Sequence, residues 1–293
     1  MYLLPNENDL TGRHTSCPNC NLEINNNNKV LVQSNPIVSM FKCNKCFLAF
    51  TNFFPSEEFL EKLYKPKQYK SHLTTNIIKT KELAIKIEKK IQINKKKITI
   101  LDFGGGNGKL ALELIALFKK RNIEAEGLVV DLYKNFDDVS LQFLNTNEFI
   151  NNNCKFDLVL ASAVLEHLPN FIEVKKKLIN SVEQGGYFYA RTPWDFDLSK
   201  LTKFYKVKWP RHLYDIGGDY WNNYFEENKN LKIVFSETSP IEIEKKFFIH
   251  YYLAFILKSI SKLEIRLKKL FNSKSSLIWK LVGGWEVLIK KDD

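Results

Sequence analysis

The sequence has no uncharged apolar run of the roughly 18 residues that a membrane-spanning helix needs. Its first residues, Met1–Glu7, lack the basic region and apolar core of a signal peptide. Internal repeats are absent, and cysteine is scarce, at five residues in 293. These absences argue against a membrane-spanning, secreted or repeat protein. We expect a cytoplasmic protein, in which paired cysteines bind metal more often than they form disulfides.

The composition suits a folded protein with a basic surface. A chain of 293 residues has room for one large domain and a small one, and its 44% hydrophobic content can form a sizeable core. The formal net charge of +11 would suit nucleic-acid binding. The lysines, however, are scattered along the chain among many Asn and Ile residues. We therefore favour a solvated basic surface and do not expect nucleic acid as a partner.

Two Cys-x-x-Cys pairs, with 22 residues between them, lie in the N-terminal part of the chain. Their members are Cys17, Cys20, Cys43 and Cys46. Four thiolates complete the tetrahedral coordination of zinc and leave no open position, so the spacing predicts a structural zinc site. Four buried thiols or redox pairs are the alternative. Asn21 and Phe47 stand where such turns often carry glycine, and the fifth cysteine, Cys154, is expected to be a lone core thiol.

From residue 98 onward, apolar segments typical of buried strands alternate with amphipathic segments typical of helices. The expected strands are 98–101, 126–131, 141–144, 156–161, 187–191, 231–237 and 285–290. Helices are expected at 72–93, at 110–120, at 171–182 before Gly185-Gly186, and after Pro55 with Ser56 as its cap. Continuous apolar strands that alternate with helices predict an α/β fold with a parallel, doubly wound sheet.

A glycine-rich turn, Asp-Phe-Gly-Gly-Gly-Asn-Gly at 102–108, follows the first of these strands. Its glycines are Gly104, Gly105, Gly106 and Gly108. Ligands of open α/β sheets lie beyond the carboxyl ends of the strands, and glycine lets the backbone approach them. Asp102 suits a ligand with an ammonium or hydroxyl groups better than a pyrophosphate, and Asp131, at the end of the second strand, can accept hydrogen bonds from ribose hydroxyls. A dinucleotide-binding dehydrogenase is the alternative, but its Gly-x-Gly-x-x-Gly fingerprint is spaced differently.

This turn resembles the first motif of class I S-adenosylmethionine-dependent methyltransferases. Residues 156–168 resemble the fourth-strand motif of that family and the Leu-Glu-His-Leu that follows it, and Gly185–Phe188 with Thr192-Pro193 resembles its fifth strand. The resemblance implies a seven-stranded, mostly parallel Rossmann-like sheet with S-adenosylmethionine as the cofactor. It also implies that Asn145, after the third strand, lies near the adenine and that Ala161, in the fourth strand, borders the cofactor.

The segments Cys46–Asn52 and Pro55–Tyr64 resemble the N-terminal part of bacterial zinc-ribbon methyltransferases. Many of these enzymes are found with genes for surface-polysaccharide and sugar biosynthesis. The resemblance implies a zinc ribbon with its N-terminal lead at 1–54, a helical linker at 55–97 and a methyltransferase domain at 98–293.

The implied activity is methyl transfer from S-adenosylmethionine to a small-molecule or glycan acceptor, and a sugar or nucleotide sugar is favoured. An RNA methyltransferase that holds nucleic acid with its ribbon, and a non-catalytic module that binds the cofactor, are the alternatives. Against RNA, the fourth strand leads into Ala161–Val164 rather than the Asn/Asp-Pro-Pro-aromatic run of base-amino methylases. The chain also has no Pro-Cys nucleophile.

An acceptor hydroxyl or carbon acid needs a general base near the transferred methyl group. Glu166 and His167 follow the fourth strand, and His212 lies in the aromatic segment Trp209–Tyr214 after the fifth. These three residues are the catalytic candidates, and a structural role is the alternative for each.

A helical insert is expected at about 241–272, between the last two strands. Within it, residues 247–271 combine an apolar stripe with interleaved Lys and Arg. Packing on the domain or on a second subunit is the favoured interpretation, and a peripheral contact with the inner membrane face is the alternative.

Overall fold

A computed structural model describes residues 3–65, 80–194, 196–201, 207–239 and 283–292. The chain divides into two compact units, each of which combines distant parts of the sequence. Unit 1 consists of Met1–Ile77, Pro193–Tyr220 and Thr238–Trp285, and unit 2 consists of Ile78–Thr192, Trp221–Glu237 and Glu286–Asp293. Residues 193–220, which the sequence motifs assign to the methyltransferase domain, therefore share a unit with the paired cysteines.

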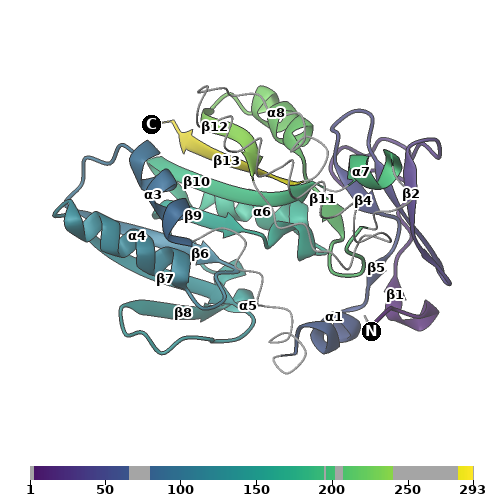
Figure 1. The fold of residues 1–293 in the computed structure, drawn as a ribbon, viewed down its shortest axis with the longest axis horizontal. Helices are drawn as coiled ribbons and strands as arrows, with labels where there is room; N and C mark the ends of the chain where they lie inside the picture. The colour runs from purple at the N-terminus through teal and green to yellow at the C-terminus, as the bar shows by residue number, and fades with distance from the viewer. Residues whose placement is uncertain (1–2, 66–79, 195, 202–206, 240–282, 293) are drawn as a thin grey trace, which may run out of the picture. The chain divides into compact units, whose positions relative to one another are not determined.

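Unit 2 is built on a seven-stranded sheet with the order β12-β13-β10-β9-β6-β7-β8 (Figure 1). The strands are β6 (Lys97–Phe103), β7 (Glu124–Asp131), β8 (Leu141–Asn145), β9 (Phe156–Ser162), β10 (Val182–Trp194), β12 (Leu231–Ser239) and β13 (Gly283–Lys291). The pairs from β8 through β7, β6 and β9 to β10 are all parallel. The strand order reverses between β6 and β9, which is where such sheets bind ligands at their carboxyl ends. The predicted mostly parallel, seven-stranded fold is confirmed.

Helices cover both faces of this sheet because its strands are apolar on both faces. Helices α3 (Thr80–Lys90) and α4 (Lys109–Lys120) lie on one face (Figure 1). Their core with the strands includes Leu83, Ala84, Ile87, Leu110, Leu114, Phe118, Ile98, Ile100, Leu158, Leu160, Tyr187 and Tyr189. The alternate strand residues point to the other face. There Phe103 contacts Phe149 of α5 (Thr146–Ile150) at a ring distance of 5.7 Å, and Phe188 contacts Trp221 of α8 (Gly218–Glu227) at 6.3 Å.

Two local predictions for unit 2 are wrong. Helix α6 (Phe171–Asn180) ends at Ser181, whose hydroxyl donates to the Lys177 carbonyl at 2.9 Å, and not at Gly185-Gly186. Both glycines instead lie inside β10, at the irregularity that precedes Tyr187. Cys154 is exposed rather than part of the core.

Unit 1 is built on a four-stranded sheet with the order β11-β4-β3-β2, in which every neighbouring pair is antiparallel. Its strands are β2 (Lys29–Ser34), β3 (Ile37–Lys42), β4 (Ala49–Thr51) and β11 (Tyr214–Asp215). A separate antiparallel pair joins β1 (Leu10–Thr11) to β5 (Phe54–Pro55), after a short 3-10 helix at Glu7–Asp9. The apolar residues 30–32 lie within β2. Strands β2, β3 and β4 follow one another in the chain, whereas β11 joins β4 from a distant part of the sequence.

The described residues of unit 1 include the helices α1 (Glu57–Tyr64) and α7 (Phe196–Leu201). Ser56 caps α1 as predicted, because its hydroxyl accepts the Phe59 N–H at 3.2 Å. Part of the helix predicted at 72–93, the insert at 241–272 and the basic stripe at 247–271 lie outside the described residues. Among the residues that the structure describes, no helix is long and apolar enough to cross a membrane.

Candidate functional site

The glycine turn connects the carboxyl end of β6 to the first turn of α4, in unit 2. The Gly104 N–H donates to the Val130 carbonyl at 2.7 Å, which fastens the turn to the end of β7. The Gly106 N–H donates to the Asp131 carboxylate at 2.9 Å. Gly104, Gly106 and Gly108 all have φ between +57° and +68°, a conformation that other residues rarely adopt. The predicted turn is therefore a backbone structure that requires glycine.

Gly106 and Gly108 have the same backbone geometry but different surroundings. A Cβ atom on Gly108 would lie 2.3 Å from Leu141 Cδ1, so this glycine permits close packing of the turn on β8. A Cβ atom on Gly106 would have no atom within 4 Å among the described residues. Gly106 therefore leaves open space beside the turn, which a bound molecule can use.

Asp102 lies beneath this turn, at the end of β6, and is 2% exposed. A Cβ atom on Gly105 would come within 2.6 Å of the Asp102 carboxyl carbon. Burial raises the pKa of Asp102 to about 7, although the Ala111 N–H stabilises its ionised form. Its Oδ2 atom has no hydrogen-bond partner in the described part of the chain. A buried carboxylate oxygen without a donor suits a ligand that brings an ammonium or a hydroxyl group.

Asp131 ends β7, two strand positions beyond the register partner of Asp102, which is Val129. Its two carboxylate oxygens accept the N–H groups of Gly106, at 2.9 Å, and Leu132, at 2.7 Å. Burial raises its pKa, and these N–H groups offset part of the rise. The Tyr133 N–H is a third donor, so about one of the roughly four acceptor positions of this carboxylate remains for a ribose hydroxyl.

Asn145 is the register partner of Asp131 on the neighbouring strand β8. Its side-chain oxygen caps α5 by accepting the Asn147 N–H at 3.0 Å, and its amide group donates to the Leu132 carbonyl at 3.3 Å. The side chain therefore has structural partners on both sides. Proximity to an adenine remains a prediction.

The end of β9 brings Ala163 and Val164 to the glycine turn, beside the predicted Ala161. Ala161 is buried and pairs with Ala190 of β10. Two residues later, Ala163 has φ of +57°, and its N–H donates to the Arg191 carbonyl at 2.8 Å. Val164 follows and fills the space beside Gly104, where a Cβ atom would lie 2.4 Å from Val164 Cγ2. A left-handed alanine after a strand gives no signal in a single sequence, so the residues themselves could not reveal this contact.

The candidate bases lie in different units. Glu166 and His167 belong to unit 2, in a 3-10 helix at Leu165–His167, with His167 Nε2 at 3.7 Å from Glu166 Oε1. Glu166 is 2% exposed and the His167 side chain is 22% exposed. His212 belongs to unit 1, where it is buried and its backbone N–H donates to the Lys208 carbonyl at 3.0 Å. A catalytic role for any of the three remains a prediction.

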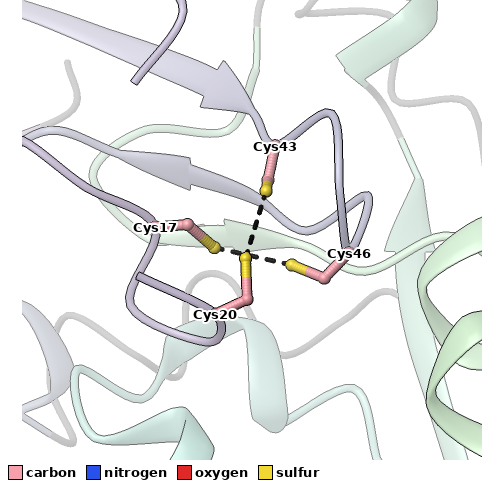
Figure 2. Close-up of side chains that lie close together, drawn as sticks. All are labelled: Cys17, Cys20, Cys43 and Cys46. Carbon is pink, nitrogen blue, oxygen red and sulfur yellow. Dashed lines mark hydrogen bonds between the residues drawn. The ribbon is translucent and has the colours of Figure 1, made fainter. Parts of the chain in front are cut away.

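The four paired cysteines of unit 1 converge on one point (Figure 2). Their sulfur atoms all lie within 4.8 Å of one another, and the Cys17–Cys46 and Cys20–Cys43 pairs are each 3.5 Å apart. Ligands at a Zn–S distance of about 2.3 Å are separated by about 3.8 Å in a tetrahedron. The arrangement therefore fits a structural zinc ion.

The two cysteine turns have matching backbone structures. The Asn21 N–H donates to the Cys17 carbonyl at 2.8 Å, and the Phe47 N–H donates to the Cys43 carbonyl at 3.1 Å. Asn21 and Phe47 both adopt positive φ, at 58° and 61°. These are the two positions where glycine was missing from the pattern, and the turns form without it.

The protonation of the free thiols is consistent with metal binding. The pKa of Cys46 falls to about 5 because the Cys17 thiol donates a hydrogen bond to it. Burial raises the pKa of Cys20 to about 11. Cys46 is therefore more acidic than Cys20 among these thiols. A zinc ion would displace the thiol protons and bind four thiolates.

Residues 75–238, more than half of the chain, match the family model described as a methyltransferase domain. No protein of curated function matches the sequence. A chain in the complex between the Haloferax volcanii Trm112 methyltransferase activator and the putative methyltransferase is similar over 80% of this chain and 98% of that one, with 12% identity and a TM-score of 0.47.

The plantazolicin methyltransferase BamL, in complex with a triazolic desmethylPZN analog and SAH, is similar over 80% of this chain and 95% of that one, with 12% identity and a TM-score of 0.49. The YcgJ protein from Bacillus subtilis is similar over 73% and 99%, with 15% identity and a TM-score of 0.43. Scores below 0.5 support no inference about substrate. The family match, together with the glycine turn and the buried acidic residues at its base, establishes that this chain belongs to the class I S-adenosylmethionine-dependent methyltransferases.

Proposed function

We propose that the protein transfers a methyl group from S-adenosylmethionine to a sugar, a nucleotide sugar or a related small glycan acceptor. Two observations support the donor half: the buried Asp102 oxygen that has no hydrogen-bond donor among the described residues, and the open space at Gly106 in the same turn. The acceptor half is supported by the resemblance of the zinc ribbon to those of methyltransferases associated with polysaccharide synthesis.

We assign the donor site to residues at the carboxyl ends of β6 to β9. Asp102 attracts the ammonium group of the donor, Asp131 accepts a hydrogen bond from its ribose, and the open space at Gly106 receives it. Asn145 and Ala161 border the same end of the sheet, at the ends of β8 and β9. When bound, S-adenosylmethionine supplies an electrophilic methyl group. The protein has to hold the acceptor in line with that group and exclude water.

Removal of the acceptor proton is the further step that needs a base if the acceptor is a hydroxyl. We assign this role to Glu166, His167 or His212. Alanine variants at the three positions separate them when methyl transfer is measured from pH 6 to 9, about the range in which imidazole loses its proton. A variant that keeps wild-type transfer across that range removes its residue from the mechanism.

The acceptor class is tested by incubating the zinc-loaded full chain with methyl-labelled S-adenosylmethionine and three sets of acceptors: nucleotide sugars, free oligosaccharides and transfer RNA. Asp131→Asn is the control with an impaired donor site. We expect label in the sugar sets from the wild-type protein and about tenfold less from the variant. Label in RNA alone would instead identify an RNA methyltransferase. Binding of the cofactor without any transfer would support a non-catalytic module.

A further inference from the structure

The cysteine ribbon shares its sheet and its core with residues that follow β10. We call the described residues 196–201 and 207–217 the post-β10 segment. It belongs to unit 1 together with the ribbon, although about 150 residues of sequence separate them. Strand β10 ends at Trp194, so this segment starts where the fifth strand of the methyltransferase sheet leaves off.

Backbone pairing attaches the segment to the ribbon. Strand β11 lies beside β4, with Tyr214 opposite Phe50 and Asp215 opposite Ala49. The Thr51 N–H extends this ladder to the Leu213 carbonyl at 3.0 Å. The ribbon sheet therefore includes a strand that the segment contributes.

Side chains add a shared core to this pairing. Phe196 and Val207 of the segment form one buried cluster with Met40 of β3 and Ala49 of β4. The Trp209 indole N–H donates to the buried Gln33 side chain at 2.9 Å. Both strands next to the second cysteine turn, β3 and β4, thus contact the segment directly.

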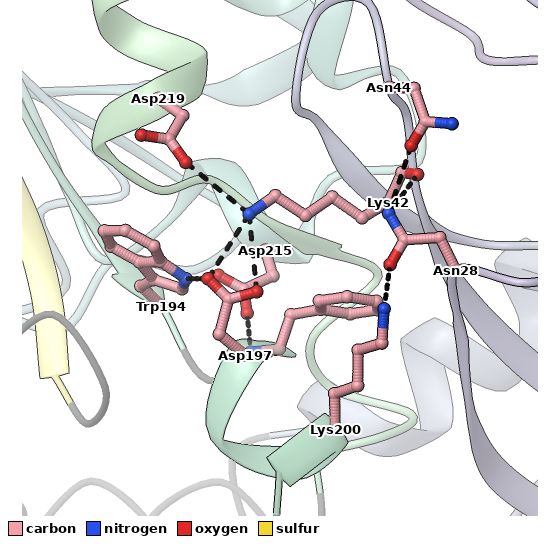
Figure 3. Close-up of polar contacts among 9 residues, drawn as sticks. Asn28, Lys42, Asn44, Trp194, Asp197, Lys200, Asp215 and Asp219 are labelled. Carbon is pink, nitrogen blue, oxygen red and sulfur yellow. Dashed lines mark hydrogen bonds and ion pairs between the residues drawn. The ribbon is translucent and has the colours of Figure 1, made fainter.

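Lys42 makes the connection closest to the metal centre, because its neighbour in the chain is Cys43 (Figure 3). Its ammonium lies 3.3 Å from Asp197 of α7 and 3.6 Å from Asp219. The Lys42 side chain is only 16% exposed. Asp197 in turn accepts the Trp194 indole N–H at 2.9 Å. Lys42, the last residue of β3, therefore pairs with Asp197 inside the post-β10 segment and with Asp219 just after it.

From these contacts we infer that the zinc centre positions the post-β10 segment, with Lys42 as the positioning residue between them. Zinc holds the turn from Cys43 to Cys46, which links β3 to β4. Without the ion, both strands lose the connection that fixes their register against β11 and α7. The inference rests on the proposed function in one respect: the donor site proposed above belongs to unit 2, so donor binding should not depend on the ribbon.

The test follows amide hydrogen exchange by mass spectrometry in the full-length protein, with S-adenosylhomocysteine affinity from calorimetry as a second measurement. We compare the zinc-loaded protein, the same protein after chelation, and Lys42→Met, which keeps the aliphatic stem and removes the charge. Lys45→Met is the matched control, because Lys45 is exposed in the same turn. Lys42→Arg restores a cation that can pair with both carboxylates.

Chelation should remove most of the protection in peptides from 207–217. Lys42→Met should raise exchange there by about fivefold to tenfold, because Asp197 and Asp219 lose the ammonium group that joins them to β3. Lys45→Met and Lys42→Arg should match the wild type. Affinity for S-adenosylhomocysteine should change by less than about twofold in every sample, as for independent sites.

Two results would overturn the inference: unchanged exchange in 207–217 after chelation, or an equal effect of Lys42→Met and Lys45→Met. A parallel loss of S-adenosylhomocysteine affinity would overturn the independence of donor binding from the ribbon. If the wild-type protein bound no S-adenosylhomocysteine at all, the proposed function would fail, and the exchange data would still decide the role of zinc.

Discussion

At the scale of the residue, the buried charge of Asp102 lowers the stability of the folded state, and we assign the same charge to donor binding. Its carboxyl group is 2% exposed, and burial holds its pKa at about 7, well above its usual value. An acid whose pKa is raised in the folded state stabilises that state when protonated, so its contribution is complete below the unfolded pKa and is lost as the pH rises through 7. At pH 8 the buried charge therefore destabilises unit 2.

Replacing Asp102 with Asn should stabilise the protein at pH 8, because Asn can still accept the Ala111 N–H and carries no charge. A pKa rise from 3.8 to about 7 corresponds to a gain of up to about 4 kcal/mol. The gain should vanish near pH 3, below the unfolded-state pKa of 3.8, where wild-type Asp102 is largely protonated in both states. Urea unfolding at the two pH values measures the difference, and equal gains at both would show that the charge is not responsible.

The raised pKa of Asp102 also predicts how the affinity for the cofactor depends on pH. An ammonium group on the ligand is attracted only to ionised Asp102, so the affinity for S-adenosylhomocysteine should fall as the pH drops below about 7. The slope should approach about tenfold per pH unit, since one proton must leave on binding. Calorimetry on the wild type and on Asp102→Asn gives the comparison. If both proteins had the same pH profile, Asp102 would have no contact with the ammonium group.

At the scale of an element, the glycine turn separates structural from ligand-binding positions. Gly108→Ala would place a side chain at positive φ and a Cβ atom 2.3 Å from Leu141. Gly106→Ala would have the same backbone strain, but its Cβ atom would meet no described atom within 4 Å. Gly108→Ala should cost at least about 2 kcal/mol more stability. Gly106→Ala should fold more nearly as the wild type and lose affinity for S-adenosylhomocysteine. The opposite ranking in thermal unfolding would mean that the two glycines have been assigned the wrong roles.

Strong local patterns explain which elements could be predicted. The alternating apolar strands, the glycine turn and the Cys-x-x-Cys spacing each depend on residues close in sequence, and the family match and the cysteine cluster agree with them. Strand β11 could not be predicted, because two residues become a strand only by pairing with β4. The end of α6 was predicted wrongly because Ser181 stops the helix before the more obvious Gly185-Gly186 is reached.

The residues of the candidate sites could likewise be predicted only where a pattern of residues close in sequence specifies them. Asp102 and Asp131 are fixed by the ends of neighbouring parallel strands, which a sequence pattern specifies. The Asn21 and Phe47 turns depart from the usual glycine, so only the backbone shows that they adopt positive φ. Lys42 gave no signal, because its partners Asp197 and Asp219 lie more than 150 residues away.

At the scale of the whole molecule, we propose a separate ligand for each unit, and a ligand stabilises the folded unit that binds it. S-adenosylhomocysteine at one hundred times its dissociation constant should protect unit 2 by about 2.7 kcal/mol, while zinc should protect unit 1. Hydrogen exchange with each ligand added alone gives the pattern. Protection in β6 to β9 from zinc alone, or in β2 to β4 from the cofactor product alone, would contradict this division.

The central claim is that the glycine turn of unit 2 binds the methyl donor. Its most direct test is a calorimetric titration of S-adenosylhomocysteine into the zinc-loaded full chain, with Asp131→Asn alongside. The Asp131 carboxylate accepts hydrogen bonds from the Gly106 and Leu132 N–H groups. We predict one-to-one binding to the wild type and at least about tenfold weaker binding to the variant, the cost of losing charged hydrogen bonds. No heat of binding at millimolar S-adenosylhomocysteine, or equal affinities for the two proteins, would contradict the claim.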